Sequence, residues 1–115
     1  MKKLVVNQAA FNYAKELIQR GQVNTAVDNW MDHCPDAESE NKYLAGHSFA
    51  EYGLWFLALD KDANDDTKDK YEFPVGDFQQ IYRSGVIAAE KRAAQFGHAE
   101  VERAAKDLLA LIDGR

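Results

Sequence analysis

Two side chains that can exchange a proton or hold a polar ligand, His47 and Glu51, stand in the most apolar stretch of the sequence, residues 43–59. This stretch contains no lysine or arginine that would keep one face in water. On a helix of about 100° per residue, both side chains share one arc with Ser48 and Trp55. An imidazole and a carboxylate four residues apart can act together in acid–base chemistry or in binding.

The arc has two interpretations. In the first, it faces solvent, and His47 and Glu51 form an ordinary surface pair. In the second, it faces a pocket or a partner, because the apolar Leu44 and Trp55 on the same arc are poorly suited to water. The second interpretation makes His47, Glu51 and Trp55 candidate binding residues.

Arg92 is the fourth candidate. It falls on the inner face of an expected helix over residues 78–96, where an unpaired guanidinium would be costly and a carboxylate partner is expected. Glu51 is the candidate partner, and together with His47 it would form a polar cluster in an apolar pocket. The alternative is that Arg92 extends along the helix edge into solvent.

The sequence completes neither of two known metal-binding motifs. The sequence has no Glu-x-x-His element of the kind that builds di-iron sites in helical bundles. Asp60, Asp62 and Asn64 alternate like the first ligands of an EF-hand, but Asp65 and Tyr71 replace the required glycine and glutamate. We therefore expect neither a metal nor a cofactor.

Motifs for nucleophilic catalysis fail as well. Cys34 follows His33 directly, and neighbours along a helix do not face each other. There is no glycine-rich phosphate loop, no Gly-x-Ser-x-Gly elbow and no Cys-x-x-Cys. No catalytic residue can be assigned, and the sequence favours a non-enzymatic protein.

Apolar residues at helical spacing predict five helices, over residues 7–20, 23–34, 36–59, 78–96 and 99–113. Asn7, Asp36 and Asp77 are the expected N-caps, and Gly21 and Gly97 are the expected ends. A kink or a full break near Gly46 would divide the third helix, which contains the apolar stretch.

Three segments fall outside these helices. Residues 60–70 carry an acidic, mixed-charge run that predicts a solvated loop. Residues 71–78 combine aromatic residues with Pro74 and Gly76, which indicates a turn held on the core. Residues 4–6 could form a strand but are too few to matter. We expect an all-α fold, a compact bundle of about five helices around a central aromatic-rich helix, in one domain over residues 1–115.

Charge and composition narrow the partners and the location. Fourteen lysines and arginines are scattered among nineteen acidic residues, with a net charge of −5, which argues against nucleic acid. The sequence has no run of about 18 apolar residues, so it predicts no membrane span. The apolar run after Lys3 is too short for a signal peptide. Cys34 is the only cysteine, which fits the cytoplasm.

The region 30–95 carries a set of residues typical of a known family. They are Trp30, His33, Pro35, Glu40, Asn41, His47, Glu51, Tyr52, Gly53, Trp55, Thr67, Lys68, Tyr71, Phe73, Pro74, Gly76, Asp77, Phe78, Arg83, Ala88, Ala89, Glu90, Arg92, Ala93 and Gln95. The segment Tyr-x-Phe-Pro-x-Gly-Asp-Phe is the most specific part. In these residues the chain resembles a family of small bacterial all-α proteins without an assigned function. The resemblance implies a shared fold and nothing about mechanism.

Two functional hypotheses follow. The first is a non-enzymatic helical interaction domain, with self-association as one form that this could take. The second is a small-molecule-binding protein or enzyme that uses His47, Glu51 and Arg92 around an apolar pocket, with Trp55 and Tyr52 as its walls.

Overall fold

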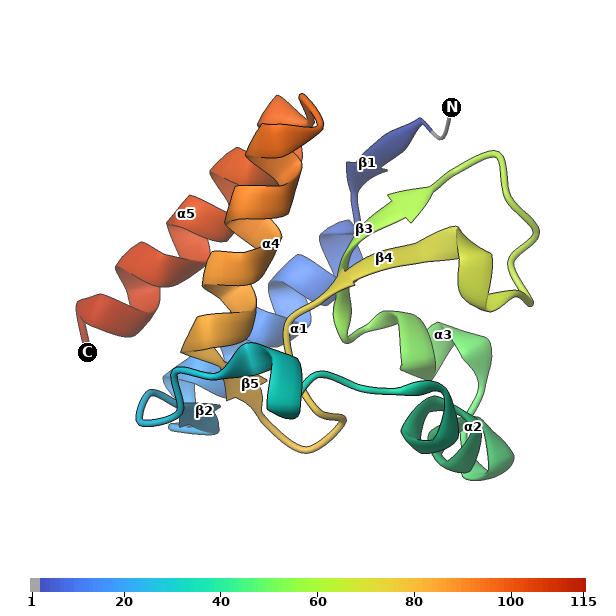
Figure 1. The fold of residues 1–115 in the computed structure, drawn as a ribbon, viewed down its shortest axis with the longest axis horizontal. Helices are drawn as coiled ribbons and strands as arrows, with labels where there is room; N and C mark the ends of the chain where they lie inside the picture. Colours follow the sequence, from blue (N-terminus) through green and yellow to red (C-terminus); the bar gives the residue numbers. More distant parts are fainter. Residues whose placement is uncertain (1–2) are drawn as a thin grey trace.

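The structure is a computed structural model that describes residues 3–115, and it combines a small sheet with five helices (Figure 1). The helices are α1 (Gln8–Gln19), α2 (Ala37–Gly46), α3 (Phe49–Gly53), α4 (Arg83–Gln95) and α5 (Ala99–Asp113). The strands are β1 (Leu4–Val6), β2 (Val23–Asn24), β3 (Phe56–Asp60), β4 (Tyr71–Pro74) and β5 (Ile81–Tyr82). Short 3₁₀ turns cover Trp30–Asp32 and Lys68–Lys70. The expected all-α helical bundle is therefore wrong, and the fold mixes helices and sheets.

The larger sheet is antiparallel in the order β1-β3-β4, with β3 in the middle. Helices α4 and α5 form a hairpin beside this sheet, and α1 runs close to both the hairpin and the sheet (Figure 1). A second, two-stranded sheet pairs β2 with β5 in parallel. The core lies between the β1-β3-β4 sheet and the three long helices, where Leu57, Ile81 and Leu108 are fully buried.

The expected central helix is the main error. Helix α2 ends at Gly46, α3 lasts only five residues, and the chain then enters strand β3. The first three residues of β3, Phe56 to Ala58, are buried because the strand is paired on both edges and covered by helices. A strand in such a place is continuously apolar, so its pattern matches that of a buried helix. The expected break near Gly46 is confirmed.

The expected helix over residues 23–34 is also wrong. Val23 and Asn24 form β2 instead, and the side chain of Asn24 then accepts hydrogen bonds from the N–H groups of Ala26 and Val27. A side chain that takes backbone N–H groups in this way favours a turn over a helix. The apolar spacing of this segment therefore predicted a helix that does not form.

Residues 71–82 form strands and a loop where a turn and a helix start were expected. Pro74 is tolerated in β4 because the N–H of the next residue, Val75, donates to Trp55, which directs the nitrogen of Pro74 away from β3. Asp77 accepts hydrogen bonds from the N–H groups of Gln79 and Gln80, but it closes a loop turn. Helix α4 begins only at Arg83.

Four expected helix ends are confirmed. Asp36 is the N-cap of α2, and its side chain accepts a hydrogen bond from the N–H of Ser39. Asn7 is the N-cap of α1 and accepts a hydrogen bond from the N–H of Ala10. Gly21 and Gly97 adopt the left-handed backbone that ends α1 and α4, with φ of 81° and 76°. Helix α5 has the expected bounds. Between residues 3 and 115, none of the helices has the length and hydropathy that a membrane-spanning helix requires.

Candidate functional site

His47, Glu51 and Trp55 line one cleft of about 660 Å³, which we call the His47 cleft. Its other lining residues are Tyr13, Leu17, Arg20, Gln22, Ser39, Lys42, Tyr43, Asp77, Phe78 and Gln79. The break between α2 and α3 positions the three predicted residues: His47 ends α2, and Glu51 lies in the first turn of α3. Most of the lining residues are polar or charged, so the cleft is more polar than the apolar pocket that was expected.

Three aromatic rings form a stack along one wall of the cleft. The imidazole of His47 lies on the ring of Tyr43, with centroids 3.8 Å apart and planes 2° from parallel. The ring of Phe78 lies 4.4 Å from the same tyrosine ring, at 13°. Two rings this close cannot occupy one face of Tyr43 without overlapping, so His47 and Phe78 cover opposite faces.

The hydrogen bond of His47 fixes its tautomer. Its Nδ1 lies 2.9 Å from the carbonyl oxygen of Tyr43. A carbonyl can only accept, so Nδ1 carries the proton, and the lone pair of the neutral ring is on Nε2. The imidazole is exposed, so Nε2 can accept a hydrogen bond from solvent or from a ligand.

Glu51 has a structural task. Its carboxylate accepts a hydrogen bond from the N–H of Ser48 at 2.9 Å, while Ser48 Oγ accepts one from the N–H of Glu51. This capping box begins α3. Mainly because the backbone of Ser48 donates to it, the pKa of the Glu51 carboxyl is lowered from its ordinary value.

Trp55 is the buried floor of the cleft, only 3% exposed. The ring of Tyr13 meets it edge to face, with centroids 5.5 Å apart. Burial raises the pKa of the Tyr43 hydroxyl, and a hydrogen bond with the Trp55 side chain partly offsets this rise. Trp55 therefore lines the cleft as a buried ring, and its role as a binding residue stays a prediction.

Phe78 and Asp77 also line the cleft, and neither was among the candidate site residues. The backbone of Phe78 is left-handed, with φ of 70°, which is unusual for an aromatic residue. Asp77 is fully engaged, because Oδ1 accepts two backbone N–H groups and Oδ2 accepts the hydroxyl of Tyr82. The Gly-Asp-Phe part of the family-like segment was the available signal.

Arg92 does not join this site. It is exposed on α4 and lines a different hollow, of about 320 Å³, beside β4. Glu40 and Glu72 also line that hollow. The structure thus places Arg92 near other carboxylates and gives no pair between Arg92 and Glu51.

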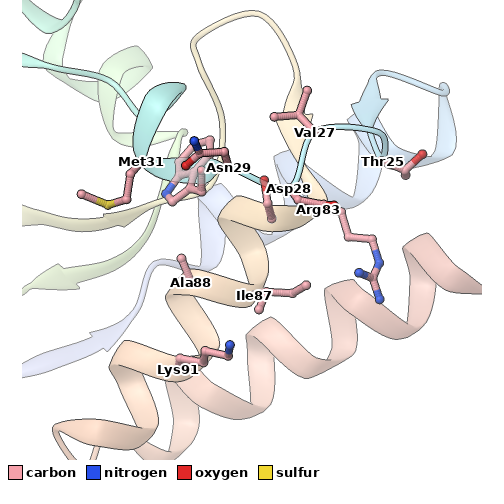
Figure 2. A pocket seen from close by; sticks show the side chains of 11 residues that line it. Thr25, Val27, Asp28, Asn29, Met31, Arg83, Ile87, Ala88 and Lys91 are labelled. Atoms are coloured by element: carbon pink, nitrogen blue, oxygen red, sulfur yellow. The ribbon is translucent and has the colours of Figure 1, made fainter.

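A second surface centres on Met31, whose side chain is 80% exposed. A hollow of about 430 Å³ lies between the loop at residues 25–31 and α4 (Figure 2). This hollow and the one beside β4 share Trp30, Met31 and Ala88 as lining residues. We call the two hollows with Met31 between them the Met31 surface. Met31 lies in the segment 23–34, for which a helix was expected, so the sequence did not indicate this surface.

The described residues offer little to a metal. Among residues 3–115, no three histidine, cysteine, aspartate or glutamate side chains lie close enough together to hold a metal ion. His33 stacks on Tyr82, and His98 lies near Phe73.

Comparisons with models of protein families, with curated proteins and with solved structures give no match. The resemblance to a small bacterial family therefore stays a prediction. Function has to be argued from the two surfaces described above.

Proposed function

We propose that the protein is a non-enzymatic interaction domain that associates with a second copy of itself through the Met31 surface. The observation that carries this proposal is the exposure of Met31, at 80%, between two hollows large enough to receive a side chain. Contiguous exposed apolar patches mark interaction sites, and Met31 adjoins the apolar side chains that line both hollows. Methionine suits such a contact because its flexible thioether adapts to irregular surfaces.

The hollows have a rigid base. Trp30 is buried beneath Met31, and its ring packs against Gly85 of α4, where an added Cβ would stand 3.1 Å from the indole. The same indole lies 5.4 Å from the ring of Tyr82. A rigid base lowers the entropic cost of association.

The charges of the Met31 surface favour a second copy of the chain over an unrelated partner. The basic lining residues, Arg83, Lys91 and Arg92, all lie on α4, and while Arg83 is paired with Asp113, the other two have no ion pair within residues 3–115. The acidic lining residues lie outside α4: Asp28 in the loop after β2, Glu40 on α2 in an ion pair with Lys68, and Glu72 on β4. Figure 2 shows Asp28 on the loop and Lys91 on α4, across the first hollow from each other.

A twofold axis would bring the basic residues of one copy opposite the acidic residues of the other. In a symmetric dimer, the same patch meets itself, so residue i faces residue j and j faces i. If Met31 of each copy enters a hollow of the other, the basic helix of one copy can face the acidic flank of its partner. The lone cysteine, Cys34, supports placing this dimer in the reducing cytoplasm.

A charge-swap experiment tests the proposal. Lys91→Glu makes α4 more acidic, and Asp28→Lys makes the flank more basic, so each variant alone should stay monomeric in light scattering. An equal mixture should restore the dimer, because each altered side chain then meets an opposite charge. Wild-type protein that stays monomeric up to roughly 200 µM, a concentration at which even weak dimers form, would contradict the proposal.

A further inference from the structure

The His47 cleft lies apart from the Met31 surface and shares no lining residue with it. Its wall is the stack of Phe78, Tyr43 and His47, and the stack ends in an exposed imidazole. One face of that imidazole is covered by Tyr43. The other face is available to a further planar ring, and stacking of aromatic rings is favourable in such positions.

The wall is built at a conformational cost. A left-handed backbone is sterically unfavourable at a residue other than glycine, and Phe78 adopts one with φ of 70°. This conformation places the Phe78 ring on Tyr43 and so fixes the face on which His47 lies. Strained residues that persist in a fold gather at ligand sites, where the strain holds a surface in its binding geometry.

Among the four charged side chains that line the cleft, Lys42 is the one that can offer a ligand an ion pair. The two carboxylates are engaged within the protein: Glu51 caps α3, and Asp77 holds the loop before β5. Arg20 is paired with Glu16. Within residues 3–115, Lys42 has no ion pair, so its ammonium is the cation of the cleft that is free to pair with a ligand.

We propose that the His47 cleft binds a small planar aromatic molecule that carries an anionic group. The ring stacks on the open face of His47, and the anionic group pairs with Lys42. A carboxylate on an aromatic ring and the phosphate of a nucleotide both satisfy this chemistry. This inference does not depend on self-association.

The test is a titration followed by NMR at the ring C–H groups of His47, with 2-naphthoate and adenosine monophosphate as probes. Cyclohexanecarboxylate has the charge without the ring, and 2-naphthol has the ring without the carboxylate. We expect saturable shifts at His47 from at least one planar anion, with a Kd below about 1 mM, and at least fivefold weaker binding of both control compounds. The tighter of the two probes identifies carboxylate or phosphate as the preferred group.

Variants separate the stack from the charge, with binding followed at the ring C–H signals of the probe itself, because His47→Ala has no imidazole signals. His47→Ala should weaken the preferred probe about tenfold, and Lys42→Gln about three- to tenfold, with unchanged circular dichroism. His33→Ala is the matched control, because His33 is also exposed and stacks on a tyrosine, at 5.6 Å from Tyr82, outside the cleft. The proposal is overturned if neither planar anion gives saturable shifts, if the control compounds bind equally well, or if His33→Ala weakens binding as much as His47→Ala.

Discussion

The ring of Trp55 lies where a Cβ atom of residue 76 would stand, with its Cε3 atom 2.6 Å from that position. Glycine at residue 76 therefore lets the loop before β5 close over the floor of the His47 cleft. The backbone oxygen of Gln80 lies 2.5 Å from the same position, so neither side of the loop leaves room for a side chain.

Gly76→Ala should lower the free energy of unfolding by several kcal/mol, because a methyl group would have to displace the indole or the backbone. Gly46→Ala is the matched control, since nothing lies within 4 Å of its added Cβ. That variant should be neutral or stabilising by up to about 1 kcal/mol. Urea denaturation checks both values, and equal effects of the two substitutions would refute the close contact.

Asn7 should be among the most sensitive polar residues. Its buried amide donates to the carbonyl oxygens of Gly53 and Phe56, at 2.8 and 3.0 Å, and its oxygen caps α1. Asn7→Ala leaves two buried carbonyls without donors, and we expect a loss of roughly 3 kcal/mol or more in urea denaturation. Asn7→Asp keeps the cap but sets a carboxylate against both carbonyls. At neutral pH it should therefore be no more stable than Asn7→Ala.

The left-handed backbone of Phe78 predicts that the glycine and alanine substitutions at this residue reverse their usual order of stability. Both Phe78→Gly and Phe78→Ala remove the ring, but only glycine adopts φ of 70° without a steric penalty. The free energy of unfolding of the glycine variant should therefore equal that of the alanine variant or exceed it by up to about 1 kcal/mol. Thermal unfolding measures this difference. At most positions alanine is the more stable of the two, and that ordinary order here would argue against the strain.

The ion pair of Arg83 with Asp113 should make stability depend on pH in acid. Arg83 donates to both carboxylate oxygens, at 2.8 and 3.0 Å, and these hydrogen bonds lower the pKa of Asp113 below its ordinary value of 3.8. A lowered pKa in the folded state stabilises the protein above pH 3.8, and this contribution is lost as the pH falls through the folded value.

Arg83→Gln removes the cause of that shift. The difference in Tm between wild type and variant should therefore be greatest near neutral pH and should shrink in acid. It should also shrink in about 1 M salt, because both side chains are exposed. A difference in Tm that stays constant from pH 7 to pH 2 would contradict the role of the pair.

Long amphipathic helices were predictable from the sequence, and short buried elements were not. Helix α5 keeps one apolar face over 15 residues, and α1 has a cap at Asn7 and a glycine after its end, so pattern and termini agreed. Strand β3 is five residues long and buried, and its apolar run has no period that distinguishes it from a helix. Its partner strand β1 was discounted because of its length, although pairing makes three residues sufficient.

The candidate site was predicted in part. His47, Glu51 and Trp55 do share a cleft, but a break in the chain and a strand bring them there, in place of one helical face. Ser48 and Glu51 have the spacing of a capping box, a signal that could have placed the start of α3. Phe78 and Met31 could not be found in this way, because a left-handed backbone and an exposed side chain depend on contacts distant in sequence.

The most direct test of the central proposal is the molar mass of Met31→Asp beside that of wild type and of Phe96→Asp, by sedimentation equilibrium. Phe96 is the matched control, because it is also an exposed large apolar residue, at 58%, and lines neither hollow. We predict that wild type and Phe96→Asp reach twice the chain mass of 13.0 kDa, while Met31→Asp stays at 13.0 kDa. A Met31→Asp variant that dimerises as wild type does, or a monomeric wild type, would contradict the proposal.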